Sequence, residues 1–283
     1  MWQALFIVWR ESVEALLVIG ILYAWINHQV NAGHTKKMLW IGTGLGILFA
    51  CALAVGFTVA GEWFSGTGGD WFQVIMMAVA SILIFQMVIW MQKNGRAMKK
   101  NLEAEAAQSF AQRGGFGILL LAMLAVAREG SEIVIFLYSS FAAAQGTAFW
   151  LLTLGSVAGA ILGYATFMLL QLSSHIISWR VFFNISAIIL LLLGGALLMS
   201  ALDKSSGLII DMLANADAPE WSYTLFDPVW DSSFILSDTT TTGSFIASIT
   251  GYRAQPMLLG IILIPLYWII AIIWTQCNNR IKH

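Results

Sequence analysis

The dominant feature of the sequence is a series of apolar runs, each long enough to cross a lipid bilayer as a helix. A helical span needs about 20 mostly apolar residues to cross about 30 Å of hydrocarbon. Seven stretches reach that length: residues 2–27, 38–60, 71–92, 116–141, 148–171, 180–202 and 257–276. Backbone polar groups in lipid must be satisfied within the protein, which favours helices. We therefore expect an all-α integral membrane protein with seven transmembrane helices.

The composition agrees with a membrane location and excludes several classes of function. Of the 283 residues, 59% are hydrophobic and 10% are charged, whereas a soluble domain carries about 25% charged residues. The formal net charge of -1 offers no basic surface for a nucleic-acid partner. The first apolar run has no basic leader and no small-residue cleavage site, so we expect a retained helix rather than a signal peptide.

Basic residues are distributed unevenly between the two sides of the predicted helices. One side carries Lys36, Lys37, Lys93, Arg96, Lys99, Lys100, Arg113, Arg180, Arg280 and Lys282. The opposite side carries only Lys204 and Arg253. Cytoplasmic loops of membrane proteins are enriched in Lys and Arg. We therefore expect the N-terminus outside and the C-terminus in the cytoplasm.

The predicted outer side is acidic, and its long segment 205–256 contains Asp227, Asp231 and Asp238. One interpretation is that these aspartates are solvated loop residues. The other is that they attract a cation to an outer mouth and hand it inward. The sequence leaves both interpretations open.

Two of the apolar runs carry charged residues at their centres. The first contains Arg10-Glu11-Ser12-Val13-Glu14, and the fourth contains Arg128-Glu129-Gly130-Ser131-Glu132. A charge at the bilayer centre costs roughly 2.5–3.5 kcal/mol on insertion scales, so each one needs compensation. Helix positions four apart share a face, so Arg10 is expected to pair with Glu14 and Arg128 with Glu132. This pairing leaves Glu11 and Glu129 without a counter-charge.

The two spare glutamates favour a binding site over ion pairs that only lock helices together. If the two helices cross near the midplane, four carboxylates meet, with Arg10 and Arg128 as charge-balancing groups. We predict Glu11, Glu14, Glu129 and Glu132 as metal ligands. Hard oxygen donors without nearby Cys or His favour a hard cation. Ferric iron fits this description, and small divalent ions fit it as well.

The chain also shows signs of an internal repeat. The charged motif recurs in oppositely directed helices, and a glycine-rich run follows it each time. We predict a single membrane domain, residues 1–283, with two inverted three-helix repeats at 1–100 and 116–204. An extracytoplasmic segment at 205–256 and a seventh helix at 257–276 complete it. Inverted repeats commonly hold the substrate site at their interface.

Paired Arg-Glu-x-x-Glu motifs in the first and fourth of seven helices resemble those of the oxidase-dependent iron permeases, in particular the bacterial EfeU type. Further matching stretches are MVIWMQK at Met87–Lys93, AVAREGSE at Ala125–Glu132, and the residues Asp231–Ser233, Leu236–Ser237, Gly251–Tyr252 and Pro256. The likeness covers nearly the whole chain. One departure is Ser12, where the family usually has Gly after the first Glu; the second motif keeps Gly130.

The resemblance implies a permease of the cytoplasmic (inner) membrane that takes up ferric iron after external oxidation. It implies that the four motif glutamates bind iron, that iron is the substrate, and that no cofactor is permanently bound. Expected partners are membrane lipid, an extracytoplasmic iron-binding protein, and an oxidase or peroxidase.

The sequence also bears on three other classes of function. A transporter of another multivalent cation, such as a divalent metal or lead, would use the same architecture and stays open. An intramembrane enzyme is not expected, because the sequence shows no partner nucleophile, catalytic His or cofactor motif. A metal-sensing receptor is not expected either, since the predicted cytoplasmic segments are too short for an output domain.

Overall fold

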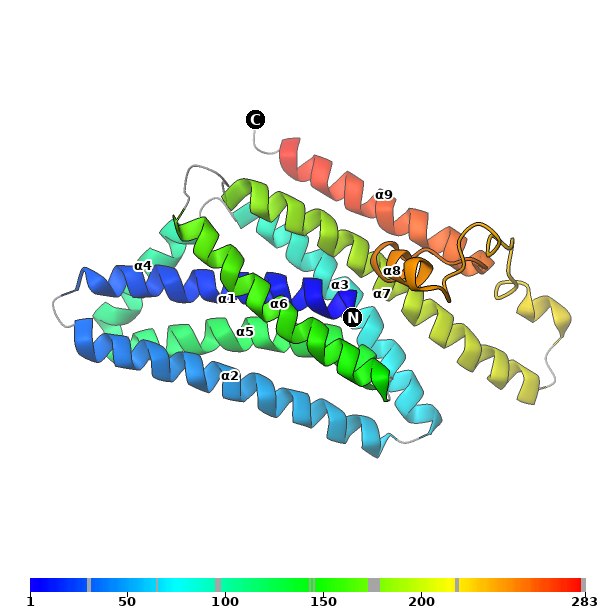
Figure 1. Ribbon diagram of the computed structural model, residues 1–283, viewed down its shortest axis with the longest axis horizontal. Coiled ribbons are helices and arrows are strands. Elements are labelled where there is room, and N and C mark those ends of the chain that lie inside the picture. Colours follow the sequence, from blue (N-terminus) through cyan, green and yellow to red (C-terminus); the bar gives the residue numbers. More distant parts are fainter. Residues whose placement is uncertain are drawn as a thin grey trace. The chain divides into compact units, whose positions relative to one another are not determined.

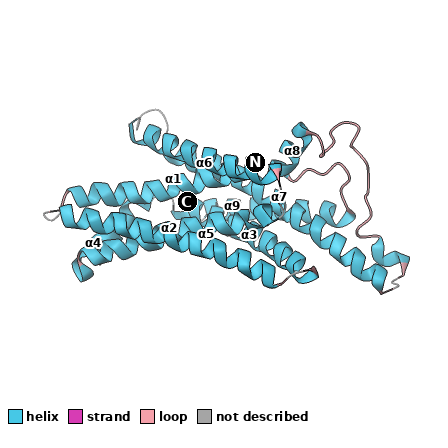
Figure 2. Cartoon of the chain, turned by 60° about the horizontal axis from the view of Figure 1, so that its bottom comes forward, coloured by secondary structure: helices cyan, strands magenta, loops and turns pink. Residues whose placement is uncertain are grey.

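A computed structural model describes residues 1–29, 32–64, 66–94, 98–142, 144, 146–172, 179–216 and 219–280. Its regular elements within these ranges are helices (Figures 1 and 2). In chain order they are α1 (Trp2–Asn27), α2 (Ala32–Trp63), α3 (Thr67–Asn94), α4 (Met98–Arg113), α5 (Gly115–Ala142), α6 (Thr147–Leu172), α7 (Trp179–Asn215), a 3-10 turn (Glu220–Tyr223), α8 (Thr241–Thr250) and α9 (Leu258–Arg280).

Four of these helices are both long and apolar enough to cross a membrane. They cover Ala32–Trp63, Thr67–Gln92, Thr147–Gln171 and Phe182–Asn215. Helices α1 and α5 have similar lengths, 26 and 28 residues, but each carries the three charged residues of a motif. The apolar part of α9, Leu258–Trp274, is shorter. The all-helical architecture thus agrees with an all-α membrane protein, while the number of seven spans stays a prediction.

Helix α7 differs from its predicted span. The sequence placed its end near residue 202, but the helix continues to Asn215 and is 37 residues long. Proline does not interrupt this stretch, since the next one is Pro219, and the single Gly207 is accommodated within the helix. The Ser205 and Ser206 hydroxyls donate to the carbonyls of Leu202 and Asp203, at 3.0 and 2.8 Å, and do not interrupt the helix. Part of the predicted segment 205–256 is therefore a helical extension.

The helices group into two compact units, and each unit draws on both predicted repeats. The first unit contains Gln3–Val59 and Asn94–Phe183, and so α1, most of α2, and α4 to α6. The second contains Ala60–Lys93 and Asn184–His283, and so α3, most of α7, α8 and α9. The first two long helices of each predicted repeat thus share a unit, as do the third ones. The repeat itself stays a prediction.

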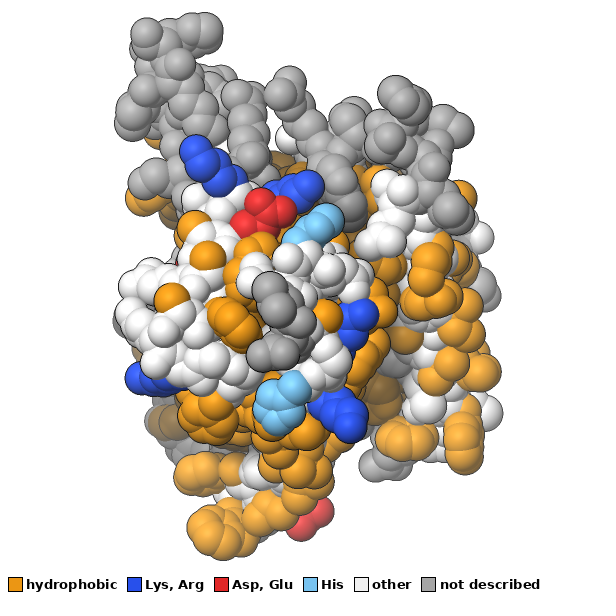
Figure 3. Space-filling model, turned by 90° about the vertical axis from the view of Figure 1, so that its left-hand side faces the viewer, with side chains coloured by type: hydrophobic (Ala, Val, Ile, Leu, Met, Phe, Trp, Pro, Cys, Tyr) orange, Lys and Arg blue, Asp and Glu red, His pale blue; other side chains and the backbone are white. Residues whose placement is uncertain are grey.

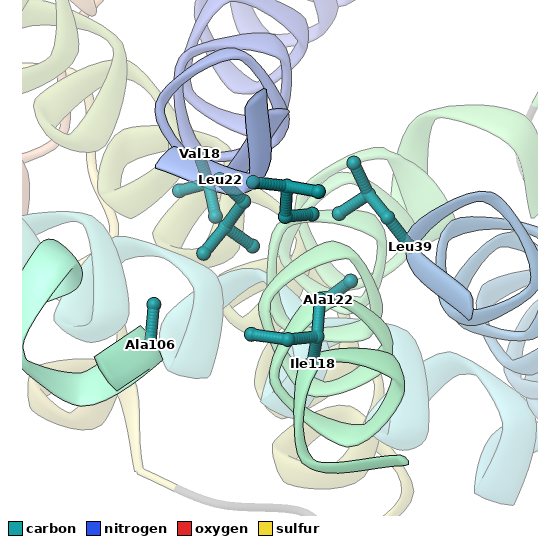
Figure 4. Close-up of a cluster of buried hydrophobic side chains, with 7 residues drawn as sticks. Val18, Leu22, Leu39, Ala106, Ile118 and Ala122 are labelled. Carbon is teal, nitrogen blue, oxygen red and sulfur yellow. The ribbon is translucent and has the colours of Figure 1, made fainter. Parts of the chain in front are cut away.

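The core of the first unit at its α4 end is a cluster of apolar side chains that exclude solvent (Figure 4). Its members are Val18, Leu22 and Ile26 of α1, Leu39 of α2, Ala106 of α4, and Ile118 and Ala122 of α5. The C-terminal half of α1 therefore packs on the N-terminal half of α5, so these two helices are antiparallel. Helix α4 also contacts α1 through the edge-to-face pair Trp25 and Phe110, with ring centroids 5.8 Å apart.

The surface at the α4 end carries Lys, Arg and His side chains beside apolar flanks (Figure 3). The described basic residues of the first unit there are Lys36, Lys37, Lys99, Lys100 and Arg113. Arg96 and Lys282 lie outside the described residues, as do the side chains of Lys93, Arg180 and Arg280. By contrast, α2 and α6 expose long apolar stretches, including Leu48, Val55, Leu154 and Ile161. Such apolar surfaces are unusual in water and suit contact with lipid.

Side-chain hydrogen bonds and an ion pair join the helices of the second unit, beside buried apolar residues such as Ile84 and Leu193. Ser81 of α3 donates to the carbonyl oxygen of Gly194 in α7 at 2.8 Å, and Tyr267 of α9 donates to that of Leu191 at 2.9 Å. Asp70 of α3 forms an ion pair with Lys204 of α7 at 2.8 Å. Interhelical hydrogen bonds of this kind stabilise helix association in lipid.

Candidate metal centre

Three of the predicted ligands come together inside the first unit. The carboxylates of Glu11 and Glu14 on α1 and Glu129 on α5 each offer an oxygen, and these oxygens lie within 4.8 Å of one another. All three side chains are buried. The antiparallel packing of α1 and α5 explains this meeting, since it places the middles of both helices side by side (Figure 1).

Arg10 binds both glutamates of the first motif. Its Nη1 donates to both carboxylate oxygens of Glu11, at 2.8 Å each, and its Nη2 lies 2.6 Å from Oε1 of Glu14. Arg10 is only 1% exposed. The expectation that Glu11 would lack a counter-charge is therefore wrong. Spacing rules consider which faces side chains share, but the long arginine arm with its five-donor fork can serve two carboxylates at once.

Arg128 makes the same two contacts in the second motif, but more loosely. Its Nη2 lies 3.1 Å from Oε1 of Glu129, and its Nε lies 3.5 Å from Oε1 of Glu132. The expectation that Glu129 would lack a counter-charge is wrong for the same reason. Unlike Arg10, the Arg128 side chain is 48% exposed. The first motif is thus tightly paired and buried, whereas the second is more open.

Two carboxylate oxygens of the second motif have no hydrogen-bond donor. Oε2 of Glu129 and Oε2 of Glu132 are buried, and no described residue donates to either. A buried acceptor without a partner is costly. Glu132 lies beside the group of three rather than within it, and its charge interacts with those of Glu11 and Arg10. Both unpaired oxygens are therefore available to a bound cation.

Each motif helix is packed against a glycine-bearing helix from the other predicted repeat. Gly42 and Gly46 of α2 lie on the backbone of α5, at the carbonyls of Leu119 and Met123. Gly155 and Gly159 of α6 lie on α1, at the carbonyls of Met1 and Leu5. A hydrogen bond of 2.9 Å from the Trp9 indole N–H to the Thr166 hydroxyl also joins α1 to α6. Small residues allow such close backbone approach in membrane proteins.

The charges of the centre suit a multivalent cation. Four glutamates and two arginines carry a formal sum of -2, and burial makes an uncompensated charge expensive. The donors are all carboxylate oxygens, which favour hard ions over soft ones. The arrangement therefore fits ferric iron, and it fits divalent ions that accept oxygen ligands.

The three aspartates that were predicted on the outer side, Asp227, Asp231 and Asp238, are not members of the group of three carboxylates, and they lie in the second unit. Asp231 accepts hydrogen bonds from the Ser233 N–H at 2.8 Å and from Nε2 of Gln255 at 2.9 Å. These bonds, with those from Ser233 dominant, hold the pKa of Asp231 below its usual range. Asp238 receives a longer bond of 3.5 Å from the Ala254 N–H, and Asp227 is exposed. Their role in receiving a cation stays a prediction.

Sequence reasoning missed several residues that support the centre. Ala50 of α2 lies against Gly130 of the second motif, and Gly163 of α6 lies against Ser12 of the first. Gly163 belongs to a regular small-residue spacing, which signals a close helix contact but not its partner. Nothing in the sequence singled out Ala50, Trp9 or Thr166.

Comparison with known proteins identifies relatives along almost the whole chain. Residues 1–277 match the Iron permease FTR1 family. Proteins named "Ferrous iron permease EfeU" from Escherichia coli O6:H1 and from Shigella sonnei are each 27% identical over 291 residues, which cover 96% of this chain and 94% of theirs. The protein of that name from Yersinia pestis is 25% identical, over 96% of this chain and 92% of its own. No solved structure matches the chain.

Proposed function

The chain belongs to the iron permease FTR1 family, and from this premise we propose that it moves iron across the cytoplasmic membrane through the carboxylate centre. The observation that carries the proposal is the meeting of Glu11, Glu14 and Glu129, whose ligand oxygens lie within 4.8 Å. Glu132 completes the proposed ligand set from the edge of that group. Iron is the transported substrate here, and no resident cofactor is proposed.

The ion pairs suggest the order in which ligands engage the cation. Oε2 of Glu129 and Oε2 of Glu132 accept no hydrogen bond from the described residues, so a cation meets no competitor there. Glu11 and Glu14 are held by Arg10, so a cation must draw them partly away from the guanidinium. A trivalent ion gains more than a divalent one from displacing such a pair, because attraction scales with charge. Binding thus begins at the second motif and is completed by the first.

We propose ferric iron as the form that the centre takes, following oxidation outside the membrane. The support is the all-carboxylate donor set, which favours a hard ion. The relatives are named for ferrous iron, so the two oxidation states must be compared directly. Another multivalent cation, such as a divalent metal or lead, is the alternative substrate.

The proposed arrangement in the membrane has seven spans, with the N-terminus outside and the C-terminus inside. Helices α1 and α5 then cross the bilayer despite their charges, because each motif compensates its own arginine. The described basic cluster at the α4 end faces the cytoplasm. Asp227, Asp231 and Asp238 face the outside, where an extracytoplasmic iron-binding protein and an oxidase or peroxidase would deliver iron.

Uptake into proteoliposomes tests this proposal. The purified chain is reconstituted, and accumulation of radiolabelled iron is measured from a ferric chelate and, in parallel, from ferrous iron with a reductant. Unlabelled manganese, zinc and lead compete in separate arms. We expect saturable uptake from the ferric source, with weaker uptake from the ferrous one. Stronger inhibition of iron uptake by one of these metals than by the same concentration of unlabelled ferric iron would assign the chain to the alternative substrate.

The Glu129→Gln variant locates the site within the same assay. It keeps the size of the side chain but removes a ligand charge, so uptake should be lost while the protein stays folded. The matched control is Glu105→Gln, because Glu105 lies exposed on α4 away from the motifs. Uptake by Glu129→Gln equal to that of the control would place the iron site elsewhere in the chain.

A further inference from the structure

The residue after the first glutamate of each motif lies at a very close helix contact. A Cβ added at Gly130 of α5 would lie 2.5 Å from Cβ of Ala50 in α2. A Cβ added at Gly163 of α6 would lie 2.7 Å from Cβ of Ser12 in α1. Carbon atoms in ordinary contact are about 3.5–4.0 Å apart. Each pair therefore has room for one Cβ and not for two.

The two pairs occupy corresponding places in the unit. Three contacts of α1 recur on α5 with a shift of 118 residues: Met1 corresponds to Leu119, Leu5 to Met123 and Ser12 to Gly130. Their partners recur with a shift of 113 residues: Gly42 corresponds to Gly155, Gly46 to Gly159 and Ala50 to Gly163. In the third contact the residue with a Cβ changes sides. It is Ser12 of the motif helix α1 in one pair, and Ala50 of the supporting helix α2 in the other.

We propose that Ser12 with Gly163, and Gly130 with Ala50, are positioning pairs for the carboxylate centre. Glu11 and Glu129 directly precede Ser12 and Gly130. The helix separation at each pair therefore fixes the position of the backbone from which each glutamate side chain extends. A second Cβ would push the helices apart by about 1 Å, whereas ligand sites tolerate displacements of about 0.5 Å. The single Cβ in each pair thus sets ligand geometry. This inference rests on the proposed function.

The requirement for a single Cβ in each pair accounts for the different residues, Ser12 and Gly130, that follow the first glutamate of the two motifs. A serine follows the first glutamate in α1, where the facing residue of α6 is a glycine. A glycine follows it in α5, where the facing residue of α2 is an alanine. Serine at position 12 is accommodated by Gly163 and does not alter the set of ligands.

Gly130→Ala and its double variant with Ala50→Gly test the rule most cleanly. Apart from Cβ of Ala50, the nearest atom to the added Cβ is Cα of Ala50 at 3.9 Å, so removing the Ala50 methyl clears the clash. Changes to residues that orient metal ligands typically cost about 10- to 100-fold in metal affinity. We expect Gly130→Ala to raise the iron concentration for half-maximal uptake by about tenfold or more, and the double variant to restore it.

The second pair should be rescued only in part. A Cβ at position 163 also lies 3.0 Å from the carbonyl oxygen of Trp9, and that contact remains when Ser12→Gly is added to Gly163→Ala. Gly44→Ala is the matched glycine control. Gly44 lies on α2, the same helix as Ala50, and a Cβ added there meets nothing within 4 Å.

Three quantities are measured for each variant. Size-exclusion chromatography gives the yield of folded protein, and the uptake assay gives the half-saturating iron concentration and the maximal rate. A positioning role predicts that the half-saturating concentration changes in Gly130→Ala and recovers in the double variant. The inference would be overturned if Gly130→Ala lowered only the yield of folded protein. It would also be overturned if adding Ala50→Gly to Gly130→Ala failed to restore the affinity for iron. If the parent chain took up no iron, the proposed function would fail instead, so the two failures are distinguishable.

Discussion

At the residue scale, the two motifs share a sequence pattern but differ in environment. Arg10 is 1% exposed and pairs with two buried carboxylates, whereas the Arg128 side chain is 48% exposed. The pattern Arg-Glu-x-x-Glu predicted the i,i+4 ion pairs, which the structure contains. It did not predict the contact to the adjacent glutamate, because rules on shared helix faces leave out the reach and the several donors of the arginine side chain. The gathering of motif carboxylates could be predicted from the sequence, whereas the asymmetry between the two motifs could not.

This asymmetry predicts unequal effects of removing the two arginines. Arg10→Ala leaves Glu11 and Glu14 buried without a counter-charge, and breaking a buried pair costs about 3–5 kcal/mol. Arg128→Ala should cost less, because Arg128 is only half enclosed and its contacts of 3.1 and 3.5 Å are longer than those of Arg10. Thermal unfolding of the detergent-solubilised variants measures the difference. Equal losses of stability would show that the exposure of Arg128 does not persist in the folded protein.

Binding of iron should weaken as the pH is lowered. The carboxylates bind the cation in their deprotonated form, so protons and cation compete for the same oxygens. Affinity is therefore highest at neutral or alkaline pH and falls on acidification. Equilibrium binding at fixed free iron activity, buffered by a chelator, measures this slope. A pH-independent affinity would mean that the carboxylates are not the ligands.

At the element scale, helix positions were predictable because long apolar runs have few alternatives in a membrane. Predicted limits of 2–27 and 116–141 lie within one residue of α1 and α5 at each end. The end of α7 was missed by 13 residues, because the polar residues Asp203 and Lys204 resemble a boundary while the helix simply continues. Which helix supports which motif could not be predicted, since glycine spacing marks a contact without naming its partner.

The apolar cluster at the α4 end should carry much of the stability of the first unit. Leu22 is fully buried there, and Leu→Ala changes at buried sites cost about 2–5 kcal/mol. We expect Leu22→Ala to lower the unfolding temperature while leaving the preference among metals unchanged. The matched control, Leu48→Ala, alters an exposed position of α2 and should have little effect. An altered metal preference in Leu22→Ala would show that the cluster helps to shape the site.

At the scale of the whole molecule, the chain divides into units that do not follow its predicted halves. The first unit takes α1 and α2 from one predicted half and α5 and α6 from the other. Its site is therefore formed by residues more than 100 positions apart in sequence, such as Glu11 and Glu129. Recurrence of the motif predicted that these residues belong together. Only the folded arrangement shows that three carboxylates, rather than four, share one close group.

The orientation of the whole chain is open to a labelling test. In a background with Cys51→Ser and Cys277→Ser, a cysteine is introduced at exposed Lys100 of α4 or at exposed Phe234 of the segment 205–256, which is predicted to lie outside. The positive-inside rule predicts that intact cells label Phe234→Cys but not Lys100→Cys with an impermeant maleimide. Permeabilised cells, in which both should react, provide the control. External labelling of Lys100→Cys would reverse the proposed topology.

The packing of α6 on α1 has a consequence for how the protein is made. Ser12 is synthesised 151 residues before its partner Gly163. Because translation proceeds at about 5–20 residues per second, α6 becomes available to pack on α1 only about 8–30 s later. Helix α5 emerges after α2, its support, is already in place. The two ion pairs within α1 need no other helix, and Arg10 can form both as soon as the helix exists. The nascent first motif thus enters the membrane with both carboxylates paired to Arg10 and with a net charge of only one.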